Sequence, residues 1–155
     1  EDPEVRQKEY EQRKRRFETD VIFKMSSRLK TNIKMYVRRV GVKGTGRKHT
    51  KSAMKDILGG DYEFFKKWIE EMFTEGMTWD NHGEWHFDHL IPTSYAETVD
   101  ELYELCHYTN YRPMWGEENV SKGNKLYINE ISEENMIRYK KFIDRYIDSD
   151  LVRYL

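Results

Sequence analysis

The chain has 155 residues, of which 35% are charged and 14% are aromatic, and its formal net charge at pH 7 is −1. This length fits one domain with an appended segment, and the aromatic content argues against a wholly disordered chain. No apolar run approaches the roughly 20 residues that a membrane-spanning helix needs, and the charged segment 1–10 does not resemble a secretory signal, so we expect an intracellular protein that is not secreted.

The first predicted element is a long helix over residues 4–40. Pro3 suits the first turn of a helix, and neither Gly nor Pro interrupts the segment before Gly41. Apolar residues recur at three- and four-residue steps from Phe17 to Val40. A basic, Gly-rich loop over 41–48 follows, which we interpret as a linker that can touch a nucleic-acid backbone.

Positive charge is concentrated in this N-terminal part. Residues 1–58 carry 17 Lys and Arg against 8 Asp and Glu, a net charge of +9, whereas residues 59–155 carry 10 against 20, a net charge of −10. A basic half implies an anionic partner, and nucleic acid is the first candidate. The alternative is an amphipathic helix with a solvated basic face. The residues of this part expected to contact DNA are Arg38, Arg39, Lys43, Arg47 and Lys48.

The elements that follow are predicted to be short. Asp61 and Ser132 are of the residue types that cap helix N-termini, and Gly59-Gly60 ends the helix before Asp61. The predicted elements are helices over 51–58, 62–73, 98–106, 117–123 and 133–148, and strands over 84–91 and 107–115. The fold class is therefore α+β and mainly helical.

The single cysteine, Cys106, limits the stabilising chemistry available to the chain. One thiol cannot form an internal disulfide or provide a cysteine cluster for structural zinc. Because Cys106 ends an apolar-rich run, we expect a buried structural thiol, which is compatible with a reducing compartment.

The residues with candidate chemistry lie on the two predicted strands and on the helix that follows them. Asp88 offers an oxygen ligand to a hard cation such as Mg²⁺, and Asn119 can supply a neutral second oxygen. The unperturbed pKa of histidine suits His89 to take a proton from water. Asn110 can tie the loop that carries His89 through hydrogen bonds to its backbone. This constellation is suited to hydrolysis of a phosphodiester bond.

Strand geometry complicates this interpretation. Successive side chains of a strand point to opposite faces, so Asp88 and His89 reach one phosphate only if a twist or bulge at Pro92 breaks the alternation. We expect His86 to face away from His89 and to be structural, with phosphate contact as the alternative. Three more histidines are expected at the surface or in packing: His49, His82 and His107.

Residues 57–126 resemble the HNH (ββα-metal) endonucleases, in particular those of phages and large DNA viruses. The motifs that carry the resemblance occur in the order seen in that family. They are Leu58-Gly59, the run from Phe73 to Asn81, Trp85-His86-Phe87-Asp88-His89-Leu90-Ile91-Pro92, the run from His107 to Trp115, and Glu118-Asn119-Val120-Ser121-Lys122-Gly123-Asn124-Lys125.

The resemblance implies a two-stranded antiparallel hairpin and a helix wrapped around one metal ion. Asp88 and Asn119 would be the metal ligands, His89 the general base, and Asn110 the residue that orients the base. The metal would be Mg²⁺, with Mn²⁺ able to substitute, and the products would carry 5′-phosphate and 3′-hydroxyl ends. The chain lacks the zinc knuckle of many relatives, so its fold must rest on packing, notably of its tryptophans.

The resemblance also divides the chain into a basic helical N-terminal arm (1–56), the nuclease core (57–126) and a C-terminal helix that packs on the core (127–155). Lys122 and Lys125 would hold the DNA backbone, the alternative being a solvated helix end. The predicted function is a DNA endonuclease that nicks or cuts double-stranded DNA, encoded by a virus or phage or acting in a bacterial cytoplasm. The alternatives are a non-catalytic DNA-binding module and a nuclease acting on RNA. The sequence does not determine whether the protein forms a homodimer.

Overall fold

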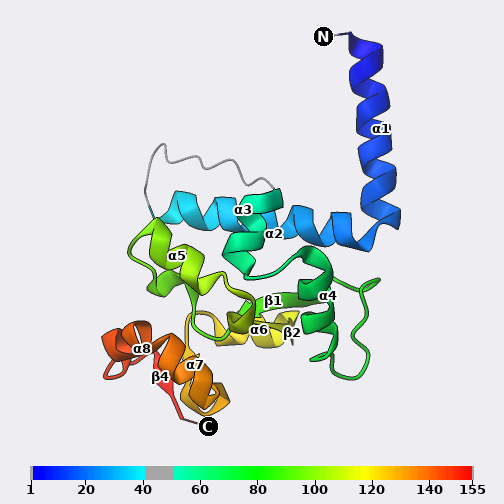
Figure 1. The fold of residues 1–155 in the computed structure, drawn as a ribbon. Helices are drawn as coiled ribbons and strands as arrows, with labels where there is room; N and C mark the ends of the chain where they lie inside the picture. The colour runs from blue at the N-terminus through cyan, green and yellow to red at the C-terminus, as the bar shows by residue number, and fades with distance from the viewer. Residues whose placement is uncertain (1, 41–50, 155) are drawn as a thin grey trace.

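The computed structural model describes residues 2–40 and 51–154 (Figure 1). Helices and a small antiparallel hairpin make up a mixed fold, which confirms the predicted α+β class. Within these ranges, no helix combines the length and apolar character needed to cross a membrane. The loop predicted over 41–48 lies outside the described residues.

The prediction of one long N-terminal helix is wrong, because the chain breaks at Asp20. Helix α1 (Pro3–Thr19) and helix α2 (Val21–Arg39) meet there at an angle, and α1 extends away from the rest of the molecule (Figure 1). Asp20 has an extended backbone (φ −108°, ψ 99°), and its carboxylate accepts a hydrogen bond from the amide of Phe23 at 2.9 Å. Asp20 is thus the N-cap of α2, which is why the helix starts again there.

The two N-terminal helices differ in burial, and the expected arm therefore does not extend to residue 56. None of the residues of α1 is buried. In contrast, α2 places Met25, Leu29 and Ile33, all with no exposed surface, in the main hydrophobic core. Only α1 projects, and α2 is part of the body.

The next two helices are α3 (Lys51–Leu58) and α4 (Tyr62–Glu70). The carboxylate of Asp61 accepts a hydrogen bond from the amide of Phe64 at 2.8 Å, as expected of a cap, but α4 ends three residues before the predicted end. The turn between the helices is tight. Gly59 has φ +77°, and a Cβ atom there would lie 2.2 Å from Nε2 of His107.

An antiparallel hairpin lies at the centre of the fold. Strand β1 (Trp85–His89) pairs with β2 (Tyr111–Trp115), and the residue opposite His89 is Tyr111. Both strands are shorter than predicted, and β2 starts late because residues 108–110 form a 3-10 turn, η2 (Tyr108–Asn110). Helix α5 (Val99–Leu105) connects the strands, and α6 (Gly116–Lys122) begins directly after β2. The order strand, strand, helix is the one expected.

Aromatic side chains fill the space around the hairpin. Trp85 is fully buried, its ring centroid lies 5.2 Å from that of Trp79, and Trp115 packs against the same core. The predicted packing of the tryptophans is therefore confirmed. Cys106 is also fully buried in this core, as expected.

The C-terminal part contains more elements than the one predicted helix. The elements after α6 are β3 (Leu126–Tyr127), η3 (Ile128–Glu130), α7 (Glu133–Arg138), α8 (Lys140–Tyr146) and β4 (Val152–Arg153). Earlier in the chain, the 3-10 turn η1 (Thr93–Tyr95) lies between β1 and α5. Strands β3 and β4 pair in parallel. A second hydrophobic cluster joins this part to the loop after β1: Ile91, Tyr95, Leu105, Leu126, Tyr139, Phe142, Ile143 and Val152.

Candidate functional site

A pocket of about 330 Å³ lies where β1, α2 and α6 meet. Asp88 and His89 from β1 and Asn119 from α6 line it, and so do Tyr36 and Arg39 from α2. Three of the four predicted site residues therefore share one pocket, and the N-terminal helix α2 contributes to its wall. The prediction from sequence did not anticipate the contribution of α2 to the pocket.

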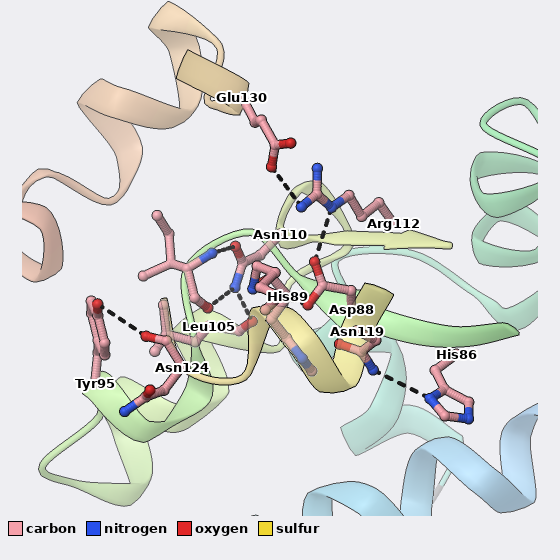
Figure 2. A network of polar contacts seen from close by, with 12 residues as sticks. His86, Asp88, His89, Tyr95, Leu105, Asn110, Arg112, Asn119, Asn124 and Glu130 are labelled. Atoms are coloured by element: carbon pink, nitrogen blue, oxygen red, sulfur yellow. Dashed lines mark hydrogen bonds and ion pairs between the residues drawn. The ribbon is translucent and has the colours of Figure 1, made fainter. Parts of the chain in front are cut away.

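Asp88 is buried and is held by two cations, Lys122 and Arg112, the second of which is shown in Figure 2. One carboxylate oxygen accepts a hydrogen bond from Nζ of Lys122 at 3.0 Å, and the other accepts one from Nε of Arg112 at 2.9 Å. Arg112 also pairs with Glu130, at 2.7 Å. A buried carboxylate is costly unless it is paired and hydrogen-bonded, so Lys122 and Arg112 account for its presence here.

Lys122 does not lie where the sequence analysis expected it. Only 3% of the residue is exposed, and its ammonium group also donates a hydrogen bond to the carbonyl oxygen of His89, at 2.8 Å. The alternative of a solvated helix end is therefore wrong for this residue, whereas its contact with a DNA backbone stays a prediction. Lys122 instead fixes Asp88 and the backbone of His89 relative to each other.

His89 follows Asp88 on β1 and lines the same pocket. Its ring packs between two tyrosines, with centroid distances of 4.2 Å to Tyr111 and 5.7 Å to Tyr36. Its Nε2 atom is buried and has no hydrogen-bond partner among the described residues. Burial, and secondarily the charge of Lys122, lower the pKa of His89 to about 3, so the ring is neutral at physiological pH.

Asn110 lies beneath the pocket and is fully buried. Its side-chain oxygen accepts a hydrogen bond from the amide of Ile91 at 2.8 Å, and its nitrogen donates to the carbonyl oxygens of Ile91 and Leu105 at 3.0 and 2.8 Å (Figure 2). The expected hydrogen bonds to the loop after His89 are therefore present. Through them Asn110 fixes the backbone two residues after His89.

Asn119 has a partner that the sequence analysis did not assign to the site. Its Nδ2 atom lies 3.3 Å from Nδ1 of His86 (Figure 2). The signal was available, because residues two apart on a strand share a face and His86 is two positions before Asp88. Arg112 is the cross-strand partner of Asp88. Its place at the site could be predicted only if the pairing register of β1 and β2 were known.

The remaining candidate residues divide into exposed and undescribed ones. Arg38 and Arg39 are exposed at the end of α2, and Arg39 lines the pocket. Nζ of Lys125 donates to the carbonyl oxygen of Ser121 at the surface. Three of the residues predicted to bind DNA, and one histidine, lie outside the described residues: Lys43, Arg47, Lys48 and His49.

Two further histidines pack against other residues, one of the two roles expected for them; His82 is buried and His107 is half-buried. His82 is buried and stacks on Trp85, with a centroid distance of 4.1 Å and an interplanar angle of 15°. The ring of His107 covers Gly59, and its Nδ1 lies 3.0 Å from Oγ1 of Thr109. Burial lowers the pKa of His82 to about 3 and that of His107 to about 4.

Comparisons with known proteins give two viral relatives. The chain is 34% identical over 136 residues to "Uncharacterized protein L426" of Acanthamoeba polyphaga mimivirus, an alignment that covers 84% of this chain and 56% of that protein. It is also 34% identical over 136 residues to "Uncharacterized protein L246" of the same virus, covering 86% of this chain and 56% of the relative. The chain thus spans a little over half the length of these relatives. No protein-family model matches the chain. No solved structure matches it significantly.

Proposed function

We propose that the protein is a metal-dependent endonuclease of the HNH type that hydrolyses phosphodiester bonds in DNA. The observation that carries the proposal is that Asp88, His89 and Asn119 line one pocket at the junction of a hairpin and a helix. The motif resemblance of residues 57–126 supports the same reaction. The mimivirus relatives fit the viral source that this resemblance implied.

The donor atoms at the pocket fit a hard divalent cation. Among the described residues, no group of three or more His, Cys, Asp or Glu side chains is placed to hold a metal ion. The donors are instead the carboxylate of Asp88 and the amide oxygen of Asn119. Each Asp88 oxygen accepts one bond from a cation and retains a lone pair. Mg²⁺ keeps several of its waters and is commonly held by one or two protein carboxylates, so a small donor set is sufficient.

When bound, the metal would supply Lewis-acid stabilisation of the charge that develops on the scissile phosphate and the leaving oxygen. His89 would take the proton of the attacking water. A general base works best with a pKa near the operating pH, so a pKa of about 3 makes His89 a weak base while it stays buried. Cleavage therefore requires the ring to gain contact with water.

The surface beside the pocket is suited to a polyanion. Arg39 lines the pocket and Arg38 is exposed next to it, at the end of the helix that follows α1. Helix α1 carries four consecutive cations, Arg13 to Arg16, and is exposed along its length. Such residues bind phosphates without reading base sequence, so we expect weak sequence specificity and strong salt dependence.

The test is conversion of supercoiled plasmid to nicked or linear form by the full chain, with Mg²⁺, with EDTA, and with His89→Ala. We expect cutting only by the unsubstituted chain with Mg²⁺. Replacing the plasmid with single-stranded DNA and with RNA in parallel reactions identifies the substrate. Cutting of RNA alone would overturn the DNA assignment.

A non-catalytic DNA-binding module is the second candidate, and the burial of His89 favours it specifically. Under this alternative the plasmid stays intact while the chain binds it in a salt-sensitive manner. His89→Ala would then leave the binding constant unchanged.

A further inference from the structure

We infer that His86 is a positioning residue that fixes the orientation of the Asn119 amide, so that the amide oxygen is turned toward Asp88. The inference rests on the proposed function, in which Asn119 is a metal ligand. It concerns which end of the amide faces the metal, a property that the motif alone does not determine.

The contact between the two side chains determines the hydrogen-bonding roles. The nitrogen of an amide side chain is only a donor, so Nδ1 of His86, 3.3 Å away, must accept and must be unprotonated. The neutral ring then carries its proton on Nε2. With its nitrogen held by His86, Asn119 has its oxygen on the side of Asp88 (Figure 2).

The ring of His86 is itself held in place against the start of α6. A Cβ atom at Gly116 would lie 3.2 Å from Cε1 of His86 and 3.0 Å from the carbonyl oxygen of Glu84. The amide of Gly116 donates to that same carbonyl oxygen at 2.8 Å. Asn119 follows three residues later, and residues three apart lie on the same side of a helix. The absence of a side chain at Gly116 therefore lets the ring reach Asn119.

The orientation matters because the two ends of an amide differ. The oxygen binds a cation, whereas the NH₂ group presents hydrogens and repels one. Residues that orient metal ligands through hydrogen bonds typically contribute about 10- to 100-fold to metal affinity or activity. A carboxylate at position 119 would have two equivalent oxygens and would need no such partner.

The experiment measures Mn²⁺ affinity of the full chain by electron paramagnetic resonance, a readout that does not depend on cleavage. We expect His86→Ala to weaken Mn²⁺ binding by about 10- to 100-fold. His86→Asn should restore most of the affinity, because its amide oxygen provides an acceptor near the position of Nδ1. In an Asn119→Asp background, His86→Ala should have little effect. Val120→Ala, on the same helix and 78% exposed, is the matched control.

Several outcomes would overturn the inference. An equal loss of affinity from His86→Ala with and without Asn119→Asp would mean that His86 does not act through the amide. Hyperfine coupling from an imidazole nitrogen to bound Mn²⁺, abolished by His86→Ala, would make His86 a direct ligand. Unchanged affinity in His86→Ala would overturn this inference alone. If the unsubstituted chain binds no Mn²⁺, the proposed function fails with it.

Discussion

Single residues at the pocket are held by buried polar contacts, and Lys122 is the clearest case. Its ammonium group and Asp88 are both nearly inaccessible to solvent, with 3% and 4% exposure. An ion pair in such a place contributes to stability only while both partners remain, because a lone buried charge is costly. The stability of the site therefore depends on matched pairs.

Lys122→Met is expected to destabilise the protein by about 3 kcal/mol, near the lower end for breaking a buried pair, because Arg112 still pairs with Asp88. Adding Asp88→Asn should recover part of the loss by removing the unmatched charge. Denaturant unfolding measures both effects. The matched control is Lys125→Met, whose ammonium group makes only an exposed contact, and which should change stability by less than about 0.5 kcal/mol. Equal destabilisation by the two lysine substitutions would contradict this account.

Asn110 gives a second prediction at this scale. Asn110→Ala leaves two carbonyl oxygens and one amide unpaired in a buried setting, at roughly 1 kcal/mol or more each. We expect a loss of about 3 kcal/mol and faster hydrogen exchange at the amide of Ile91. Asn124→Ala, at an exposed position, should leave that exchange rate unchanged. Unaltered protection of Ile91 in Asn110→Ala would show that the loop is held by other interactions.

Elements with strong local sequence signals were predictable, and elements whose bounds depend on long-range packing were not. The caps at Asp61 and Ser132, the hairpin and the helix after it were predictable from residue type and pattern. The break at Asp20 carried a cap signal that the continuing apolar pattern concealed. The break at Tyr139 has no such local signal, since its hydroxyl bonds to Thr109, 30 residues away.

The same distinction holds at the candidate site. The motif spacing predicted four site residues: Asp88, His89, Asn110 and Asn119. All of them except Asn110 line one pocket. The partners of Asp88 come from β2 and from the buried side of α6, and their identity depends on strand register and helix rotation. The residue pattern alone therefore did not identify the partners of Asp88.

Helix α1 gives a prediction at the scale of an element. Because α1 buries none of its residues, deleting residues 1–19 should leave the denaturation midpoint nearly unchanged, with Asp20 still capping α2. The salt dependence of DNA binding should become weaker, by about 0.9 in slope for each phosphate that α1 no longer neutralises. Urea unfolding and a salt titration of DNA binding measure the two effects. A large drop in stability would mean that α1 packs more closely than the structure indicates.

At the scale of the whole molecule, three of the histidines in the described residues are neutral, two of them buried and His107 half-buried. The pKa values of His82 and His89 are lowered to about 3 and that of His107 to about 4, against 6.5 for an ordinary histidine, chiefly because burial disfavours the charged ring. Between these values and pH 6.5 the unfolded chain binds more protons than the folded one. Their contribution to stability is therefore full above pH 6.5 and decreases as the pH falls.

We expect the free energy of unfolding to decrease from about pH 7 to about pH 5. At the lower pH, each chain should take up as many as roughly three protons when it unfolds. Urea unfolding at a series of pH values gives this number from the slope. His82→Phe keeps a ring stacked on Trp85 and should reduce the uptake by one proton. A stability independent of pH over this range would contradict the buried, neutral histidines.

The pairing of Asp88 with Lys122 and Arg112 also bears on how the protein depends on metal. Small metal-binding domains whose ligands are brought together only by the ion unfold when a chelator removes it. Here the carboxylate is already neutralised by the chain's own cations, so the protein should remain folded, with a cooperative thermal transition, when EDTA removes the metal. The ion would then bind reversibly to a site that is already folded without it. Different metals could be exchanged into one folded preparation and compared directly.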